Sequence, residues 1–360
     1  MMLFLGSKYC THRQSWKLKL ALLLPLMLLT VFVKSQDVKE LRIGFYNVEN
    51  FFDPFVDSTR EYNEFTEQGE QRWNYFRYKK KRTNMYKTIM AMGAGKPLSL
   101  MGLCEIENDF VLRDLIYSTP LKQFNYQYIN YPSPDRRGID VGIIYRPEQL
   151  RLIYSEPIPL KDPENPRFRS RDMLYASFLV EDTDTIHVYI NHWPSRWGGE
   201  VATKPLRMLA AKRLRRHLDS IRENVNPHAN FIIMGDFNDT PDEVSITQGL
   251  RALPVEEVTD EGDLVNLFTP QRDLGYIGTL KYQYNWQIFD MLILSQSLYN
   301  AKKGVHYKPG SAQIFNAPFL FVEDERYMGD KLFRTYIGPK YQGGFSDHLP
   351  IYIDLLVGEE

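Results

Sequence analysis

Two short polar motifs stand at the edges of apolar runs in this 360-residue chain, and their residue types suit catalysis. Gly-Asp-Phe-Asn at 235–238 follows a strand-like apolar run, and Ser-Asp-His at 346–348 leads into another. Because residues two apart in a strand face the same side, Asp236 and Asn238 can serve one site while Phe237 packs opposite. A folding core does not need carboxylate, amide and imidazole groups there, but hydrolysis of a phosphate ester beside a metal ion does. The motifs therefore predict metal-assisted phosphoester hydrolysis.

Other oxygen-bearing side chains stand at strand ends and suit a hard divalent cation. Asn47 lies in the apolar run 41–48, and Glu105 follows the run 98–104. Together with Asp347 they offer the carboxylate and amide oxygens that such a cation prefers to thiolate. A phosphodiester is negatively charged and repels hydroxide, and a bound cation neutralises that charge. These three residues are the candidate metal ligands.

Two histidines can supply the acid–base chemistry that an attacking water needs. His348 has an unperturbed pKa near neutrality, as a general base requires. Asp290, which opens an apolar run, can hold the other ring nitrogen and fix the tautomer. Asn238 and His192 can donate hydrogen bonds to charge that develops on the phosphate. Each residue alone has an ordinary explanation at a turn or strand end, so the prediction depends on the whole set in this order.

Apolar runs of strand length must position these groups. The runs are rich in Ile, Val, Leu, Phe and Tyr, and they span 41–48, 98–104, 141–145, 185–190, 231–234, 291–294 and 349–357. Their near-continuous apolar character predicts burial on both faces. Helices are predicted at 71–92 and at 204–223, with Pro205 in the first turn of the second. The long segment 297–344 is rich in aromatic residues and glycine, and we predict a small subdomain, lid or insertion beside the site.

The first 35 residues have the pattern of a secretory signal peptide. A basic region at 8–19 precedes an apolar run at 20–33, which is short for a membrane span. We predict cleavage near Ser35, with an uncleaved membrane tether as the alternative. Residues 36–360 are then predicted to form one catalytic domain, and the protein is expected to be exported, either secreted or periplasmic.

Charge and cysteine content limit the partners of the mature chain. Loss of residues 1–35 removes five of the 44 basic residues and none of the 45 acidic ones, so the mature chain is acidic. It lacks the overall basic footprint of a nucleic-acid-binding protein, and contacts must come from local clusters such as 136–137, 167–171 and 193–197. Because Cys10 lies in the predicted leader, Cys104 has no partner for an intramolecular disulfide.

Taken together, the motifs resemble those of the endonuclease/exonuclease/phosphatase superfamily, which includes deoxyribonuclease I and exonuclease III. The resemblance spans 41–357, and it includes Tyr-Asn-Val-Glu-Asn at 46–50, the stretch 138–147 and Asn-His-Trp-Pro-Ser-Arg at 191–196. It implies an α/β (α+β) fold class. The implied architecture is a deoxyribonuclease I-like four-layer sandwich of two packed, mostly antiparallel sheets flanked by helices, with the site at one edge.

The resemblance also implies which residues hold the metal and the phosphate. Glu105 would be the principal metal ligand, with Asn47 and Asp347 close to the ion. The ion is expected to be Mg²⁺, with Mn²⁺ or Ca²⁺ as possible replacements. Asp236 and Asn238 would hold the phosphate and orient water.

The two histidines take separate roles in the resemblance. His348, paired with Asp290, would act as the base, and His192 would protonate or stabilise the leaving oxygen. A histidine at this second place is typical of the deoxyribonuclease I, sphingomyelinase and inositol-phosphatase branches, whereas the exonuclease III branch tends to lack it. Asp140 lies near the sequence position at which the resemblance places the partner of His192, and we predict that Asp140 orients the ring of His192.

We therefore expect an exported Mg²⁺-dependent phosphodiesterase, most plausibly an endonuclease. It would be a monomer with nucleic acid as the favoured substrate and no protein partner. The alternative keeps the chemistry and changes the substrate: a phosphatase or a phospholipase C-type enzyme for inositol phosphates or sphingomyelin-like headgroups. A non-catalytic binding module ranks last, because such a protein should have lost at least one of the catalytic residues and none is lost.

Overall fold

Strand β1 (Lys39–Phe51) shows how an apolar run is buried on both faces in the computed structural model, which describes residues 39–56 and 63–359. Ile43 and Phe45 join the core between the two sheets, whereas Tyr46 and Val48 join the core beneath the helices. Because successive side chains of a strand point to opposite faces, a sheet covered on both sides needs this near-continuous apolar sequence. The predicted signal peptide at 1–35 lies outside the described residues.

The first sheet contains the strands on either side of β1. Its order is β14-β20-β1-β2-β4-β3, and β15 also pairs with β20. The β1–β2 pair is parallel, and the other pairs are antiparallel. The bounds are β2 (Leu100–Ile106), β3 (Gln127–Asn130), β4 (Asp140–Tyr145), β14 (Lys303–Tyr307), β15 (Gln313–Ile314) and β20 (Ile351–Glu359).

The second sheet packs against the inner face of the first. Its order is β5-β6-β7-β8-β13-β10-β9, in which β7–β8 and β9–β10 are parallel and the other pairs antiparallel. The bounds are β5 (Leu150–Ile158), β6 (Met173–Val180), β7 (Asp184–His192), β8 (Asn230–Asp236), β9 (Ala252–Leu253), β10 (Leu264–Asn266) and β13 (Asp290–Ser295).

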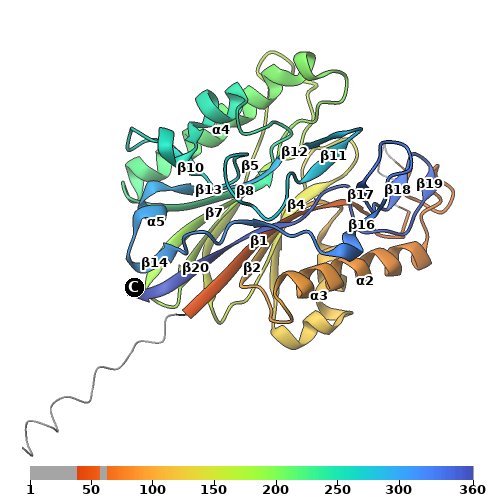
Figure 1. Cartoon of the computed structure of the whole chain (residues 1–360), viewed down its shortest axis with the longest axis horizontal. Helices are drawn as coiled ribbons and strands as arrows, with labels where there is room; N and C mark the ends of the chain where they lie inside the picture. Colours follow the sequence, from red (N-terminus) through yellow and green to blue (C-terminus); the bar gives the residue numbers. More distant parts are fainter. Residues whose placement is uncertain (1–38, 57–62, 360) are drawn as a thin grey trace, which may run out of the picture. The chain divides into compact units, whose positions relative to one another are not determined.

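Helices cover the outer faces of both sheets (Figure 1). Helices α2 (Tyr75–Met92) and α3 (Asp109–Tyr117) pack on the first sheet, where Met85 and Ile89 share a core with Val111 and with residues of β1 and β2. Helix α4 (Glu200–Asn224) buries Leu214 and its neighbours against the second sheet. The layers follow each other as helix, sheet, sheet and helix. The predicted four-layer sandwich with mostly antiparallel sheets is confirmed.

The helix boundaries differ from the prediction at their N-terminal ends. Helix α2 begins at Tyr75 because the side chain of Asn74 accepts a hydrogen bond from the backbone N–H of Arg77 and caps the first turn. Helix α4 begins at Glu200, after Gly199. Pro205 therefore lies inside the helix rather than in its first turn, which corrects the prediction, and it removes one backbone donor there.

The segment 297–344 is divided between the sheet and the surface. It follows the start of α5 (Gln296–Asn300), and its strands β14 and β15 extend the first sheet beside β20. The 3₁₀ turn at Pro318–Leu320 leads to two hairpins: β16 (Phe321–Glu323) with β17 (Asp330–Leu332), and β18 (Tyr336–Ile337) with β19 (Lys340–Tyr341). A third hairpin pairs β11 (Leu280–Tyr282) with β12 (Asn285–Gln287), and β11 contacts β17. No helix of the described residues is long and apolar enough to cross a membrane.

Candidate active site

Strand ends bring the predicted polar residues together at one edge of the packed sheets. In the first sheet Asn47 lies on β1, and Glu105 lies near the end of the parallel strand β2. In the second sheet His192 ends β7 directly beside Asp236, which ends β8. Asp290 opens the antiparallel strand β13, and its backbone is also paired with that of Asp236. Residues far apart in sequence therefore converge because parallel strands finish at the same edge.

Two imidazoles flank one carboxylate oxygen at the centre of the site. The Nε2 atom of His348 lies 3.8 Å from Oδ2 of Asp236, and Nε2 of His192 lies 3.7 Å from the same oxygen. On its other side, Nδ1 of His348 forms a 2.7 Å hydrogen bond with Oδ2 of Asp290. Because Asp290 is an acceptor, this bond places the proton on Nδ1 and leaves Nε2 free to accept one. The predicted His348–Asp290 pair is present.

Asp236 is fixed by hydrogen bonds to both of its oxygens. Asn47 donates from Nδ2 to Oδ2 of Asp236 at 3.0 Å, and the backbone N–H of Asn238 donates to Oδ1 at 2.9 Å. Asn238 has φ of 52°, and its Nδ2 donates to the carbonyl of Trp193 at 3.1 Å. A left-handed backbone is less costly for asparagine than for most residues, which explains the amide at this position. The Asp-Phe-Asn sequence thus forms a rigid turn at the strand end.

Glu105 occupies a strained position between the two sheets. Its φ of 60° places it in the left-handed region, at the register shift between β2 and β4. Its Oε2 accepts from the backbone N–H of Asn50 at 2.8 Å, and its Oε1 lies 3.3 Å from Nη2 of Arg137 and 3.9 Å from Nε2 of His192. A non-glycine residue in this conformation costs free energy, and such strain is common at functional sites.

Asp347 belongs to a charged cluster that sequence reasoning did not find. Arg334 donates from Nη2 to Oδ2 of Asp347 at 2.8 Å and from Nε to Oε1 of Glu49 at 2.8 Å. Glu49 is buried, and it also accepts from the backbone N–H of Thr335. The buried ammonium of Lys81 donates to Oγ1 of Thr335. The nearest sequence signal was the motif at 46–50, which contains Glu49 but says nothing about an arginine near the other end of the chain.

The neighbours of the two histidines give them opposite pKa shifts. Burial alone lowers the pKa of His348, but the carboxylates of Asp290 and Asp236 outweigh burial and raise it well above the usual value. Burial, reinforced by Arg171 and Arg137, holds the pKa of His192 well below the usual value. Burial raises the pKa of Asp236 to about 7, an effect that His348 opposes. His348 therefore favours the protonated form, and His192 favours the neutral one.

The geometry does not support the prediction that Asp140 orients His192. Oδ1 of Asp140 accepts from the backbone N–H and the hydroxyl of Ser133, at 2.8 and 2.6 Å. The buried Nδ1 atom of His192 has no hydrogen-bond partner among the described residues. Asp140 opens strand β4 and closes the turn at 133–140, so its role in the structure is that of a turn residue. The sequence position was near the site, but the side chain is already used locally.

The donor set fits a hard divalent cation. Asp236, Asp290 and His348 each offer one ligand atom, and these atoms lie within 4.8 Å of one another. Glu105 adds another carboxylate: Nε2 of His192 lies 3.9 Å from Oε1 of Glu105 and 3.7 Å from Oδ2 of Asp236. These candidate ligands are carboxylates and one imidazole, which suit a hard cation. The only cysteine among the described residues, Cys104, is buried, and burial raises the pKa of its thiol, so it stays protonated. Asn47 and Asp347, the other predicted ligands, bond to Asp236 and Arg334 respectively.

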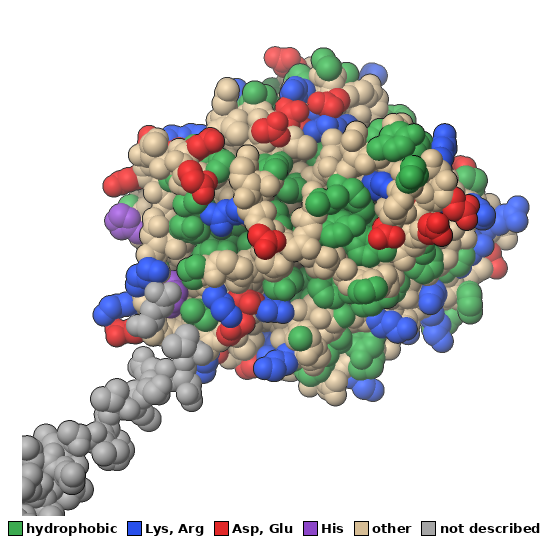
Figure 2. Space-filling model, in the orientation of Figure 1, with side chains coloured by type: hydrophobic (Ala, Val, Ile, Leu, Met, Phe, Trp, Pro, Cys, Tyr) green, Lys and Arg blue, Asp and Glu red, His purple; other side chains and the backbone are tan. Residues whose placement is uncertain are grey.

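Three loops that carry the predicted basic clusters are joined by one buried arginine. Arg171 pairs with Oδ2 of Asp135 at 3.1 Å and donates to the carbonyl of Trp193 at 2.6 Å. Trp193 is fully buried and cannot serve as a stacking surface, whereas Trp197 is 91% exposed. On the face seen in Figure 2, Lys and Arg side chains are scattered and do not gather into one band. The basic residues near the site are thus a local feature of these loops.

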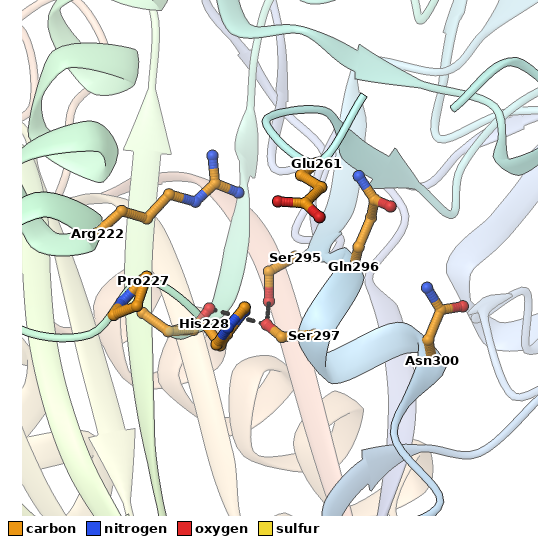
Figure 3. Close-up of a pocket in the computed structure, with 9 residues that line it drawn as sticks. Arg222, Pro227, His228, Glu261, Ser295, Gln296, Ser297 and Asn300 are labelled. Atoms are coloured by element: carbon orange, nitrogen blue, oxygen red, sulfur yellow. Dashed lines mark hydrogen bonds between the residues drawn. The ribbon is translucent and has the colours of Figure 1, made fainter. Parts of the chain in front are cut away.

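A hollow of about 260 Å³ lies at the opposite ends of β8 and β13 from the site (Figure 3). Ser297 donates to the carbonyl of Ala229 at 3.0 Å and bonds with Ser295 at 2.8 Å, so both hydroxyls are used within the protein. Arg222 donates to the carbonyl of Gly262. The two serines and Arg222 thus hold neighbouring segments together here, and the candidate active site lies at the other edge.

The comparisons with known proteins agree with this geometry. Residues 42–356 match the profile of the endonuclease/exonuclease/phosphatase family. A family member from Bacteroides thetaiotaomicron has a solved structure that is 15% identical, covers 90% of this chain and 100% of its own, and superposes with a TM-score of 0.56. A mannosyl-6-phosphatase from the same organism is 17% identical, covers 88% of this chain and 99% of its own, and superposes with a TM-score of 0.54. The human Nocturnin catalytic domain is 13% identical, covers 89% of this chain and 96% of its own, and superposes with a TM-score of 0.53. No curated protein sequence matches the chain.

The chain belongs to the endonuclease/exonuclease/phosphatase family. It is therefore a phosphoesterase of a superfamily of hydrolases that depend on a divalent metal, and its acidic site suits such an ion. The resemblance inferred from the motifs at 235–238 and 346–348 is confirmed over almost the whole described chain.

Proposed function

We propose that the protein is an exported, Mg²⁺-dependent endonuclease that hydrolyses phosphodiester bonds with an activated water. The observation that carries this proposal is the pair of imidazoles at 3.8 and 3.7 Å on either side of Asp236, one of them held by Asp290 at 2.7 Å. Hydrolysis of a diester needs a base for water on one side of phosphorus and a donor for the leaving oxygen on the other.

The two histidines would divide this work. Because Asp290 and Asp236 favour the protonated ring, His348 would act as the base from its deprotonated form: Nε2 would accept the proton of water, and the carboxylate of Asp290 would stabilise the imidazolium that forms. His192 is neutral because its pKa is lowered, so it supports the leaving oxygen as a hydrogen-bond donor more readily than as a proton source. Glu105 would be the principal ligand of the cation beside Asp236, and Asn47 and Asp347, which bond to Asp236 and Arg334, would lie close to it; the bound ion would neutralise the charge of the phosphate.

The loops beside His192 support nucleic acid as the substrate. Arg171 joins the loops around Asp135 and Trp193, and the exposed side chains of Arg136, Arg167 and Arg169 extend from the same loops. Side chains of this kind contact phosphates in nucleic-acid complexes, and an exposed indole such as that of Trp197 can stack on a base.

The second candidate is a phosphatase or a phospholipase C-type enzyme that uses the same groups. Two proteins of similar structure favour it: one is a mannosyl-6-phosphatase, and another is ANGEL2, a 2',3'-cyclic phosphatase that is 12% identical. At these identities the likeness shows the fold alone, so we rank this candidate below the nuclease.

A panel of substrates separates the two candidates. Purified protein from Gln36 onward is incubated with Mg²⁺ and with plasmid DNA, RNA, inositol phosphates or sphingomyelin, beside His348→Ala. Nicked plasmid that depends on His348 supports the endonuclease. Intact nucleic acid with release of phosphate or headgroup from another substrate contradicts it and favours the second candidate. Cell fractionation of the full chain tests export, which cytoplasmic retention would contradict.

A further inference from the structure

A hollow of about 230 Å³ lies directly beside the active site and shares Asp347 with it. It lies between the β11–β12 hairpin and the β16–β17 hairpin, which contact each other (Figure 1). The charged side chains that line it are Lys281, Asp324, Arg326, Lys331, Arg334 and Asp347. Four of these six are cationic, so the hollow has an excess of positive charge beside the place where the phosphate is cleaved.

Part of this charge is neutralised within the protein. Lys281 donates to Oδ2 of Asp324 at 2.9 Å and to the carbonyls of Met328 and Asp330, at 3.1 and 2.9 Å. Both side chains of this ion pair are nearly buried. All donors of the ammonium are thereby used, and the pair holds the two hairpins together. The Lys281–Asp324 pair is a structural bridge that shapes the wall of the hollow.

Two cations on the wall have no carboxylate of the described residues within hydrogen-bonding distance and can bind an anionic ligand. Arg326 is exposed, and no carboxylate of the described residues pairs with it. Lys331 has only Asp324 within reach among the described carboxylates, at 3.8 Å, and Asp324 is already held more closely by Lys281. A guanidinium and an ammonium at the mouth of a hollow form a site for an anionic group such as a phosphate.

An aromatic surface lies next to these cations, at the edge of the hollow that Tyr327 lines. The guanidinium of Arg326 lies 5.0 Å from the ring centre of Tyr327. The ring of Tyr284, which is 67% exposed, meets that of Tyr327 edge-on at 4.8 Å. Exposed aromatic rings beside cations bind the bases of single-stranded nucleic acids by stacking, while the cations contact the backbone.

The inner end of the hollow connects the wall to the catalytic residues. Arg334 reaches Asp347 at 2.8 Å, and the buried carboxylate of Glu49 holds it from behind at 2.8 Å. A ligand in the hollow would therefore touch the side of the site that Asp347 and His348 form. A single strand of substrate could place one phosphate in the active site and the next nucleotide in the hollow.

We propose that this hollow is a substrate subsite for the nucleotide next to the scissile phosphate. Arg326 and Lys331 bind its phosphate, and the exposed ring of Tyr284, which Tyr327 contacts edge-on, stacks on its base. The proposal rests on the proposed endonuclease function and adds a place of substrate selection to it. It predicts a preference for single-stranded or unpaired segments, because a base must leave its duplex to reach this ring.

The test compares a short substrate with a long one. Hydrolysis of bis(p-nitrophenyl) phosphate, which has no neighbouring nucleotide, is measured beside cleavage of a single-stranded oligonucleotide. In Arg326→Ala and Lys331→Ala we expect kcat/KM for the oligonucleotide to fall about tenfold more than that for the small diester, mainly through KM. Arg151→Ala and Lys303→Ala, exposed cations outside the hollow, serve as matched controls and should leave both values unchanged.

A second arm changes the substrate instead of the protein. An oligonucleotide with one neutral methylphosphonate next to the scissile phosphate should be cleaved about tenfold less efficiently by the wild type, and the double variant R326A/K331A should not distinguish it from the normal one. Equal losses on both substrates, or oligonucleotide cleavage that is unaffected by the variants, would overturn the subsite. A wild type that hydrolyses the small diester but no oligonucleotide would contradict the endonuclease function itself.

Discussion

Identical side chains behave differently in this site because their neighbours differ. His348 faces the carboxylates of Asp290 and Asp236, which raise its pKa, whereas His192 is buried near Arg171 and Arg137, and its pKa is lowered. The surroundings of the two rings thus push their pKa values apart, although both are histidines. The division of roles is set by the charges around each ring and cannot be read from the residue type.

Replacement of Asp290 by asparagine should disable the base without emptying its position. The amide of the new side chain can donate where the carboxylate of Asp290 only accepts, so His348 loses both the tautomer that Asp290 imposes and the stabilisation of its imidazolium. We expect kcat/KM for the small diester to fall by about 10²–10⁴-fold. His228→Ala, which changes an exposed histidine at the far end of β8, should leave kcat/KM at the wild-type value. A D290N protein of full activity would remove the pair from the mechanism.

His187 should make the protein less stable in mild acid. Burial, with a smaller effect of His217, lowers its pKa from 6.5 to about 4, and its Nδ1 bonds with the hydroxyl of Tyr175 at 2.8 Å. Since the unfolded chain binds the proton more readily, the contribution is present above pH 6.5 and is lost as pH falls towards 4. Between pH 7 and pH 5 we expect the free energy of unfolding to drop about 1–2 kcal/mol more in the wild type than in His187→Gln. Urea titrations at both pH values measure this, and equal pH dependence would contradict it.

The candidate site was predictable where a residue stands at a strand end beside a short motif. Asp236, Asn238 and His348 satisfy that condition, and the structure brings them together. Arg334 does not, because it comes from an irregular segment and reaches Glu49 and Asp347 only through the fold. Asp140 shows the opposite error: its position resembled that of a catalytic partner, but a local turn uses its carboxylate.

At the scale of the elements, the close approach of β7 and β8 explains the glycine of the Gly-Asp-Phe-Asn motif. A Cβ atom at Gly235 would lie 2.4 Å from the carbonyl oxygen of Asn191 and 2.6 Å from its Cβ. Gly235 and Asn191 are register partners in this parallel pair, and Asp236 and His192 come next. The absence of a side chain at 235 thus lets two catalytic residues lie side by side.

Gly235→Ala should therefore damage both stability and activity. The clash with backbone atoms cannot be relieved by rotating a side chain, and we expect a loss of about 2–3 kcal/mol in the free energy of unfolding. Activity should fall as well, because Asp236 and His192 move apart. Gly262→Ala is the matched control, since its Cβ would meet only side-chain ends, at 3.3 Å. Similar unfolding midpoints for the two variants in urea would count against this account.

The strands could be predicted where burial on both faces requires a run of apolar residues. The apolar runs at 41–48, 231–234 and 349–357 became β1, β8 and β20 because sheets covered on both faces need them. Strand β5 was missed because most of its residues are exposed or half-buried at the edge of its sheet, as Arg151 and Tyr154 show, so it lacks a continuous apolar run. The parallel pairings also could not be predicted, since pairing between distant strands is decided by packing and not by local sequence.

At the scale of the whole molecule, binding of a cation at the site should affect both the activity and the folding stability of the protein. The carboxylates of Asp236 and Asp290 lie close together and repel each other, and a cation that binds the native state favours folding by mass action. We expect a chelator to reduce kcat/KM by about 10²-fold or more and added Mg²⁺ to restore it. Mg²⁺ should also raise the Tm of the wild type, and this rise should be absent in Glu105→Gln. Full activity after thorough chelation would contradict the metal mechanism.

Strand β1 is paired on one side with β20, so residues from the two ends of the described chain are neighbours in the sheet. The hydroxyl of Ser346 also bonds to the carbonyl of Asn47 at 2.7 Å, and His348 follows two residues later. During synthesis, the ribosome has made nearly every other strand before this partner of β1 exists. Because His348 lies just before β20, a chain that stops short of this histidine lacks the proposed base. The proposed site is therefore complete only after the last described strand has paired with β1.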